Sequence, residues 1–379
     1  MFFFLHIMLL ITCPFWLTSL LTTELKRLGL KPFNVFTTGC RIDSDRPDDI
    51  MTINLQSRIA NKVYRQLATG PAKTFEELFQ LTKTIDRHRF LPATVPFTVR
   101  VVSTDSLLHA ERSVQSIVHK AVITGLTGDP DAHRPTDEMA QSQEIFVIIE
   151  HDVARLFINT SWPGLHERGR RTEAGDAPIK ENLAAATLLL ASRPFHQPLR
   201  DPCCGSGTLI IEAALLAQNT PPWHQRLFAF QDFSEFSPAS FEQTKNDLLA
   251  KRITKPRTFI ASDIDPDVLA KAKRNAERAG VADLIIFVEH DVLSKTLPVW
   301  LTAAKPVTIV CNPPYEKRLR SDTVSAVHLR LASLIQQPWR NGAVISWYDD
   351  AALYFSPDQR KRKETRQGKE KCYIWSVKW

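Results

Sequence analysis

The chain has 379 residues, of which 44% are hydrophobic and 23% are charged. These values are typical of a globular protein and exclude a disordered or collagen-like chain, and the length suffices for two or three domains. The formal net charge of +7 is compatible with a polyanionic partner. The six cysteines form no Cys-x-x-Cys pair, which argues against a zinc site or a disulfide framework and favours the reducing cytoplasm.

The first 21 residues are apolar, but they have no basic start and no small-residue cleavage site, and Pro14 interrupts them. About 20 residues would just span a bilayer, so a membrane segment remains an alternative. We favour a buried strand over Phe3–Ile11 and an amphipathic helix over Leu17–Leu28 that Gly29 ends. We therefore expect no stable membrane association.

Short elements alternate through the first 160 residues. Apolar positions at helical spacing predict a helix over Asn54–Ala68, and Thr74 with Glu77 forms a capping box for the next helix. Beyond them, the pattern predicts a strand at Phe97–Val102, a helix at Leu107–Gly125, and strands at Ile145–Glu150 and Val153–Asn159. Strand, helix and hairpin together make a compact α/β unit.

A glycine turn dominates the second half of the chain. Residues 199–214 read as a strand that ends at Asp201, a turn through Gly205, Ser206 and Gly207, and an apolar helix that Thr208 opens. Glycines without a Cβ allow a sharp turn and a close approach to a ligand, and a helix N-terminus favours anions. A third glycine of the dinucleotide fingerprint is missing, as is the Gly-Lys-Ser/Thr ending of a Walker loop.

A second motif follows about a hundred residues later. The β-branched strand Val307–Cys311 runs into Asn312, Pro313, Pro314 and Tyr315, and consecutive prolines fix a rigid loop. In an open α/β sheet, ligands bind at this carboxyl edge of the strands. An ordinary loop, or a polyproline ligand for a WW-type domain, is the alternative interpretation.

Two further strands end at acidic residues. The strand at residues 258–262 ends at Asp263, which Ile264 follows, and the strand Leu284–Val288 precedes Asp291. Asp265 and Asp267 are predicted to cap the helix over Val268–Ala279. A further strand at residues 343–347 and a last antiparallel strand at residues 372–378 complete the half.

The turn around Gly205 resembles motif I of class I S-adenosylmethionine-dependent methyltransferases. The resemblance implies that Asp201 faces the methionine ammonium or braces the turn, that Asp263 binds the ribose hydroxyls with Ile264 against the adenine, and that Asp291 binds the adenine amino group. It also adds the turn residues to the S-adenosyl-L-methionine site, which would contain Asp201, Cys203, Gly205, Ser206, Gly207, Thr208, Asp263, Ile264 and Asp291. No metal is expected.

The Asn-Pro-Pro-Tyr loop fits methyl transfer to an exocyclic amine. Such an amine is a poor nucleophile because its lone pair is delocalised into the ring. The Asn312 Oδ1 atom and the Pro313 carbonyl can each accept one amino hydrogen, and Tyr315 can stack on a flipped base. We therefore predict Asn312, Pro313, Pro314 and Tyr315 as the catalytic residues. The family commonly has a glycine after the tyrosine, whereas Glu316 stands here.

The resemblance extends over nearly the whole chain. Segments at residues 12–14, 24–29, 165–171 and 177–184, and the Phe228-Ala229-Phe230 triplet, are similar to the bacterial THUMP-containing RNA methyltransferases, which include the guanine-N2 methyltransferases of large-subunit ribosomal RNA. This implies an α/β protein with a ferredoxin-like part (1–50), a THUMP RNA-binding domain (51–160), a linker and pre-motif helix (161–190), and a C-terminal class I Rossmann-like methyltransferase domain (191–379).

These predictions converge on a cytoplasmic RNA methyltransferase that modifies the N2 amino group of guanine, with 23S ribosomal RNA as the favoured substrate. Guanine-N2 methylation of transfer RNA and adenine-N6 methylation rely on the same loop chemistry and remain alternatives. A non-catalytic RNA-binding ribosome assembly factor is the alternative of another class.

Overall fold

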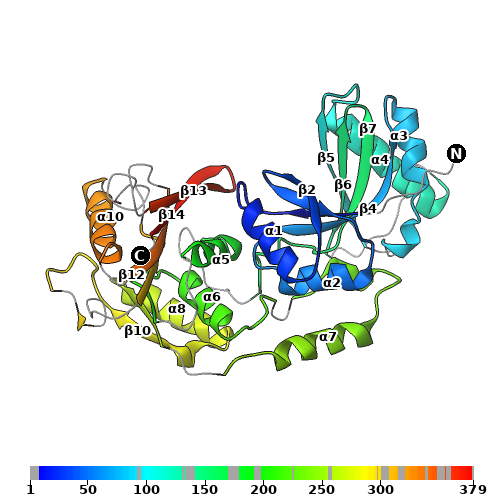
Figure 1. Cartoon of the computed structure of the whole chain (residues 1–379). Coiled ribbons are helices and arrows are strands. Elements are labelled where there is room, and N and C mark those ends of the chain that lie inside the picture. The colour runs from blue at the N-terminus through cyan, green and yellow to red at the C-terminus, as the bar shows by residue number, and fades with distance from the viewer. Residues whose placement is uncertain are drawn as a thin grey trace. The chain divides into compact units, whose positions relative to one another are not determined.

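The computed structural model describes residues 8–91, 95–129, 132, 141–169, 179–191, 198–223, 226–254, 258–296, 298–299, 307–314, 321–337, 340–347, 355 and 360–377. The chain forms two compact units (Figure 1). The first unit contains Met1–Thr12, Thr22–Leu165 and Leu227–Thr244, and the second contains Cys13–Leu21, His166–Arg226 and Lys245–Trp379. The division into four domains remains a prediction.

The first unit is built on one seven-stranded sheet with the order β2-β3-β1-β4-β7-β6-β5. Neighbouring strands are antiparallel except for the parallel pair β5 and β6. The strands are β1 (Leu9–Thr12), β2 (Pro32–Phe36), β3 (Gly39–Ile42), β4 (Lys62–Pro71), β5 (Phe97–Thr104), β6 (Gln143–Glu150) and β7 (Val153–Asn159). The last three agree with the predicted strands to within two residues.

The helices of the first half are α1 (Thr18–Arg27), α2 (Pro47–Gln56), α3 (Phe75–Lys83) and α4 (Glu111–Thr127). The predicted capping box is confirmed, because Thr74 accepts the Glu77 N–H and the Glu77 carboxylate accepts the Thr74 N–H. The helix predicted over Leu17–Leu28 is confirmed as α1, and Gly29 follows it with φ +84°. Residues 3–7 of the strand predicted over Phe3–Ile11 lie outside the described residues, and the rest of it corresponds to β1, which begins at Leu9.

The helix predicted over Asn54–Ala68 is wrong. Helix α2 ends at Gln56, and Lys62 begins the strand β4. Val63 and Tyr64 suit a strand, and β4 pairs with β1 on one side and β7 on the other, so pairing in the sheet overrides the helical spacing of the apolar residues.

Within the described part of the chain, no helix is long and apolar enough to cross a membrane.

The second unit contains another seven-stranded sheet, with the order β10-β9-β8-β11-β12-β14-β13. The first five strands of this order are parallel to one another. Strand β14 is antiparallel to β12, and β13 is antiparallel to β14. The strands are β8 (Leu199–Asp201), β9 (Phe259–Asp263), β10 (Ile285–Glu289), β11 (Val307–Cys311), β12 (Arg340–Ser346), β13 (Arg360–Gln367) and β14 (Glu370–Val377). Each strand predicted in this half is present.

The helices of the second half are α5 (Glu181–Leu190), α6 (Thr208–Ala217), α7 (Pro238–Ala250), α8 (Pro266–Arg278) and α10 (Ser321–Ile335). Helix α6 follows β8 and packs against α5, while α8 packs on β9 and β10, and α10 on β11 and β12 (Figure 1). Asp265 caps α8 as predicted, because its Oδ1 atom accepts the N–H groups of Asp267 and Val268.

Residues 227–244 follow α6 in the sequence but belong to the first unit. There the Glu235 carboxylate accepts hydrogen bonds from the guanidinium groups of Arg65 and Arg89. The ring of Phe233 packs edge-on against Phe90, with the ring centroids 5.3 Å apart. An ion-pair network and an aromatic contact therefore fasten this insertion to the N-terminal sheet.

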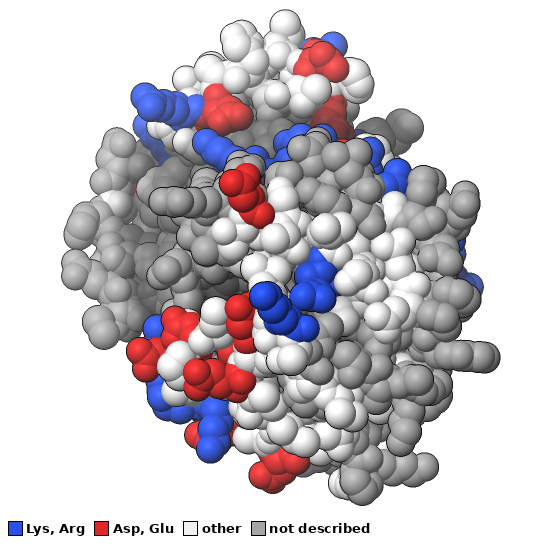
Figure 2. Space-filling model, turned by 90° about the vertical axis from the view of Figure 1, so that its left-hand side faces the viewer, with Lys and Arg blue, Asp and Glu red and all other residues white. Residues whose placement is uncertain are grey.

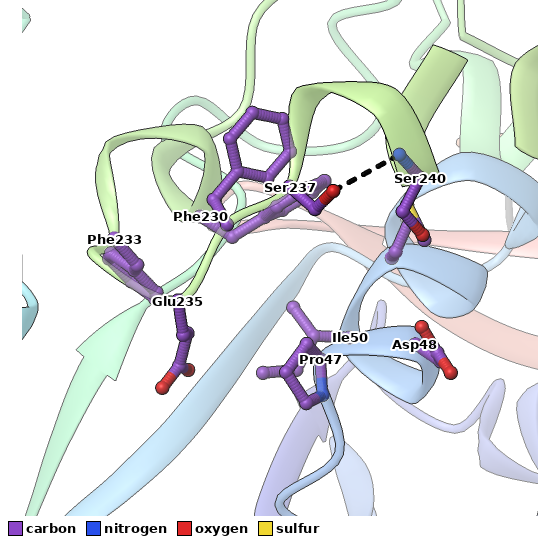
Figure 3. A pocket seen from close by; sticks show the side chains of 10 residues that line it. Pro47, Asp48, Ile50, Phe230, Phe233, Glu235, Ser237 and Ser240 are labelled. Carbon is purple, nitrogen blue, oxygen red and sulfur yellow. Dashed lines mark hydrogen bonds between the residues drawn. The ribbon is translucent and has the colours of Figure 1, made fainter. Parts of the chain in front are cut away.

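A pocket of about 250 Å³ separates this insertion from α2 (Figure 3). Its walls are mostly apolar and include Ile50 from α2 and Phe230 from the insertion, while a hydrogen bond from the Ser240 N–H to the Ser237 Oγ atom closes one side. None of the residues predicted to bind cofactor or substrate lines it.

Candidate active site

The order of the strands in the second sheet reverses between β8 and β11. The chain runs from β8 outward through β9 to β10, then returns to β11 on the other side of β8. Open α/β sheets bind ligands at the carboxyl ends of the strands where this reversal occurs. Asp201, Asp263 and Asn312 stand at or just after the carboxyl ends of β8, β9 and β11.

The glycine turn after β8 is held by bonds to the neighbouring strand. The Cys204 N–H donates to the Ser262 carbonyl at 2.8 Å, and the Gly207 N–H donates back to the Cys204 carbonyl at 2.9 Å. Gly205 and Gly207 have φ angles of +54° and +87°, which L side chains rarely adopt, so glycine is required at both positions. Helix α6 begins directly after Gly207, as predicted.

Asp263 joins the turn to the end of β9. Its Oδ2 atom accepts the Gly205 N–H at 2.9 Å, and its Oδ1 atom accepts the Asp265 N–H at 3.2 Å. A carboxylate oxygen has two lone pairs, so each oxygen keeps one for another donor. Ile264 follows with 63% of its surface exposed, and both residues line the same cleft.

Asp201 lies beneath the turn. It is fully buried, and its Oδ1 atom accepts the Cys203 N–H at 3.3 Å. Its Oδ2 atom has no hydrogen-bond partner among the residues that the structure describes. Burial, together with the nearby Asp263 carboxylate, raises the pKa of Asp201 well above its usual range. The carboxyl group thus braces the turn through its bond to Cys203.

Asp291 stands just beyond β10. Its Oδ1 atom accepts the Leu293 N–H at 2.8 Å, and its carbonyl accepts the Ser294 N–H at 2.9 Å, so the residue shapes a tight turn. The His290 N–H donates to the Asp263 carbonyl, which ties this turn to the β9 edge. Asp291 and His290 both line the cleft.

The Asn-Pro-Pro segment leaves β11 on the other side of the reversal. Asn312 and Pro314 line the cleft. The Asn312 Oδ1 atom is buried and has no hydrogen-bond partner in the described part of the chain. The sequence predicts that Tyr315 stacks on the base, and Glu316 departs from the family pattern. Both residues lie outside the described residues.

The cleft that these segments share has a volume of about 620 Å³. The structure brings together most of the predicted residues along it, whereas Asp201, Gly207 and Pro313 do not line it. The predicted residues along the cleft are Cys203, Gly205, Ser206, Thr208, Asp263, Ile264, Asp291, Asn312 and Pro314. The cleft therefore joins the predicted cofactor residues to the predicted catalytic loop.

Some residues that line the cleft were not among the predicted site residues. Thr323 and Val327 reach it from α10, which was not foreseen. The apolar residues Val324, Val327 and Leu331 stand at helical spacing and are buried, so this period could have revealed the helix. Lys271 of α8 lines the cleft as well.

Two family models match the chain. The model described as "RMKL-like, methyltransferase domain" matches residues 168–346, and the "RlmL ferredoxin-like domain" model matches residues 8–64. They confirm the predicted α/β fold class, with a methyltransferase domain after an N-terminal ferredoxin-like part. The family resemblance seen in the sequence is confirmed as well.

Individual proteins agree with the family models. A solved structure titled "SMU.472, a putative methyltransferase complexed with SAH" is 26% identical with a TM-score of 0.83, and the match covers 98% of this chain and 97% of that one. The ribosomal RNA large subunit methyltransferase K/L of Vibrio parahaemolyticus is 31% identical over 80% of this chain but only 43% of its own length. The "Putative RNA methyltransferase YpsC" of Bacillus subtilis is 34% identical over 82% of this chain and 80% of its own. On this similarity and the two matching models, the chain belongs to the RMKL-like methyltransferase family.

Proposed function

We propose that this methyltransferase transfers a methyl group from S-adenosyl-L-methionine to the exocyclic N2 amino group of a guanine in RNA, with 23S ribosomal RNA as the substrate. The observation that carries the proposal is the buried Asn312 Oδ1 atom, which lines the cleft without a partner among the described residues. A buried acceptor left without a donor costs free energy, and an amino hydrogen of the substrate would satisfy it.

The residues of the cleft fit the cofactor. Asp263 keeps one lone pair on each carboxylate oxygen for the two ribose hydroxyls, and the exposed Ile264 beside it offers an apolar surface to the adenine. Asp201 lies beneath the turn and does not line the cleft, and we assign the methionine ammonium to its second oxygen, which has no hydrogen-bond partner among the described residues. The start of α6 at Thr208 suits the methionine carboxylate, because a helix N-terminus favours negative charge.

When bound, S-adenosyl-L-methionine supplies an electrophilic methyl group on a sulfonium. The chain's own contribution is to orient the amine. Asn312 Oδ1 and the Pro313 carbonyl each accept one amino hydrogen, which favours the pyramidal amine and directs its lone pair out of the base plane. Such positioning can contribute several kcal/mol, and no general base is required before the attack.

The RNA substrate is inferred from the relatives, because the names of the curated relatives state RNA or ribosomal RNA methyltransferase. A base within a duplex is hidden, so the target guanine would lie in a loop or be extruded. Basic and acidic described side chains are interspersed on the face drawn in Figure 2, so charge on that face does not mark a route for RNA. We assign RNA capture to a THUMP-type region in the first unit.

Incubation with labelled S-adenosyl-L-methionine and separately purified ribosomal and transfer RNA, followed by nucleoside mass spectrometry, tests this proposal. We expect N2-methylguanosine in ribosomal RNA with the wild type and none with Asn312→Ala. Label in transfer RNA alone, or the detection of N6-methyladenosine, would contradict the proposed substrate but agree with the proposed methyl transfer to an exocyclic amine. No label in naked RNA or in ribosomal assembly intermediates would favour a non-catalytic assembly factor.

A further inference from the structure

Helix α8 contacts the glycine turn from the side that faces away from solvent. Asn275 of this helix is 1% exposed, and its Nδ2 atom donates to the Ser206 carbonyl at 3.0 Å. Ala272 lies one helical turn earlier, so close that a Cβ built on Gly207 would be 3.2 Å from the Ala272 Cβ. Both contacts come from one face of α8, because residues three apart in a helix are neighbours.

The orientation of the Asn275 amide is fixed by Arg278. An Nη2 hydrogen of Arg278 is donated to the Asn275 Oδ1 atom at 2.7 Å. A guanidinium group only donates hydrogen bonds, so the oxygen of the amide must face Arg278 and the NH₂ group must face Ser206. The three groups form a relay from the end of α8 to the turn.

The Ser206 carbonyl belongs to the same peptide group as the Gly207 N–H, which closes the turn on the Cys204 carbonyl. Glycine rotates more freely than other residues, so the peptide between Ser206 and Gly207 needs an external anchor to keep one orientation. Ser206 itself lines the cleft. A rotation of this peptide would therefore change the surface that meets the cofactor.

We propose that Asn275 is a positioning residue, which fixes the Ser206–Gly207 peptide in the conformation that binds S-adenosyl-L-methionine. The inference rests on the proposed function, because it assigns the cofactor to this turn. It predicts that Asn275 contributes to cofactor affinity through preorganisation of the turn and leaves the methyl-transfer step unaffected.

Calorimetric titration with S-adenosylhomocysteine on the full-length protein tests the inference. Asn275→Asp keeps the shape of the side chain but replaces the NH₂ donor with an oxygen, which would face the Ser206 carbonyl. We expect this variant and Asn275→Ala to weaken binding about tenfold, as befits the loss of one buried hydrogen bond. Turnover at saturating cofactor should stay within about twofold of the wild type.

Val281→Ala is the matched control. Val281 is 1% exposed, and its N–H donates to the Ala276 carbonyl at the end of α8, so its truncation destabilises the same helix at a position outside the glycine turn. Hydrogen exchange should accelerate over residues 203–210 of the unliganded Asn275 variants and remain unchanged in Val281→Ala.

The outcomes separate the two proposals. Binding by Asn275→Asp within twofold of a wild type that does bind would overturn the inference, as would an equal loss in Val281→Ala. Failure of the wild type to bind S-adenosylhomocysteine would overturn the proposed function, and the inference with it.

Discussion

The Asp263 carboxylate and the Gly205 N–H are joined by a 2.9 Å hydrogen bond that connects the carboxyl end of β9 to the turn after β8. One acid thus shapes the turn and faces the cleft. We expect Asp263→Ala to weaken S-adenosylhomocysteine binding by more than tenfold, because hydrogen bonds to charged groups contribute about 1.5–3 kcal/mol each. The measurement is calorimetric titration. Asp283→Ala, which removes an exposed acid of the same unit, is the control and should bind normally.

Asn312 should affect turnover far more than cofactor affinity. Asn312→Ala removes an acceptor for the substrate's amino hydrogens, while the residues that hold the cofactor stay in place. We expect kcat to fall at least about 100-fold, and S-adenosylhomocysteine affinity to change by less than about threefold. Single-turnover kinetics and titration measure the two quantities. Parallel losses in both would show that Asn312 supports the cofactor site instead.

The residues of the candidate site were largely predictable, because glycine turns, strand-ending acids and consecutive prolines act locally. Gly205 and Gly207 adopt positive φ angles because of their own backbone freedom, and Asp263 ends a strand whose β character is evident in the sequence. Non-local pairing was not predictable. The strand β4 replaced a predicted helix because β1 and β7 flank it, and no local signal assigns residues 227–244 to the first unit.

Asp201 should make the stability of the protein depend on pH. Burial first, and the Asp263 charge second, raise the pKa of Asp201 in the native state. Its contribution to stability is therefore fully present below the unfolded pKa of about 3.9 and is lost as pH rises through the higher native pKa.

Asp201→Asn cannot ionise, so we expect its Tm to exceed that of the wild type by a margin that grows between pH 4 and pH 8. Differential scanning calorimetry across this range measures the margin. A constant difference would contradict the assignment. Addition of S-adenosylhomocysteine should narrow the margin at pH 8, because its ammonium stabilises the ionised carboxyl group of the wild type alone.

Cys203 should be the thiol that cofactor protects. It is half-buried and lines the cleft. Cys204 also lines the cleft but is buried, as are the other four cysteines. Burial raises the pKa of Cys40 and Cys372 to about 12, and the pKa values of Cys204 and Cys311 well above their usual range, so these thiols are poor nucleophiles. We expect iodoacetamide to label Cys203 first, and S-adenosylhomocysteine to slow the labelling at least about fivefold. Peptide mass spectrometry locates the label, and unchanged labelling with bound ligand would place the cofactor elsewhere.

Glu235 should stabilise the first unit although it lies in the sequence of the methyltransferase half. Its carboxylate is shared by Arg65, whose side chain is 5% exposed, and Arg89, which is 46% exposed. Removal of the carboxylate leaves the buried Arg65 charge without its partner and puts Arg65 and Arg89 in repulsion, so Glu235→Ala should cost about 3 kcal/mol. Arg89→Ala breaks only the exposed Arg89–Glu235 ion pair and should cost less than about 1 kcal/mol of stability. Denaturant unfolding measures the loss of stability in both variants. Equal losses would contradict the larger contribution that we assign to the buried Arg65–Glu235 pair. Because the ion pairs belong to the first unit and the cleft residues to the second, S-adenosylhomocysteine affinity should be unchanged in both variants at a temperature at which they are folded.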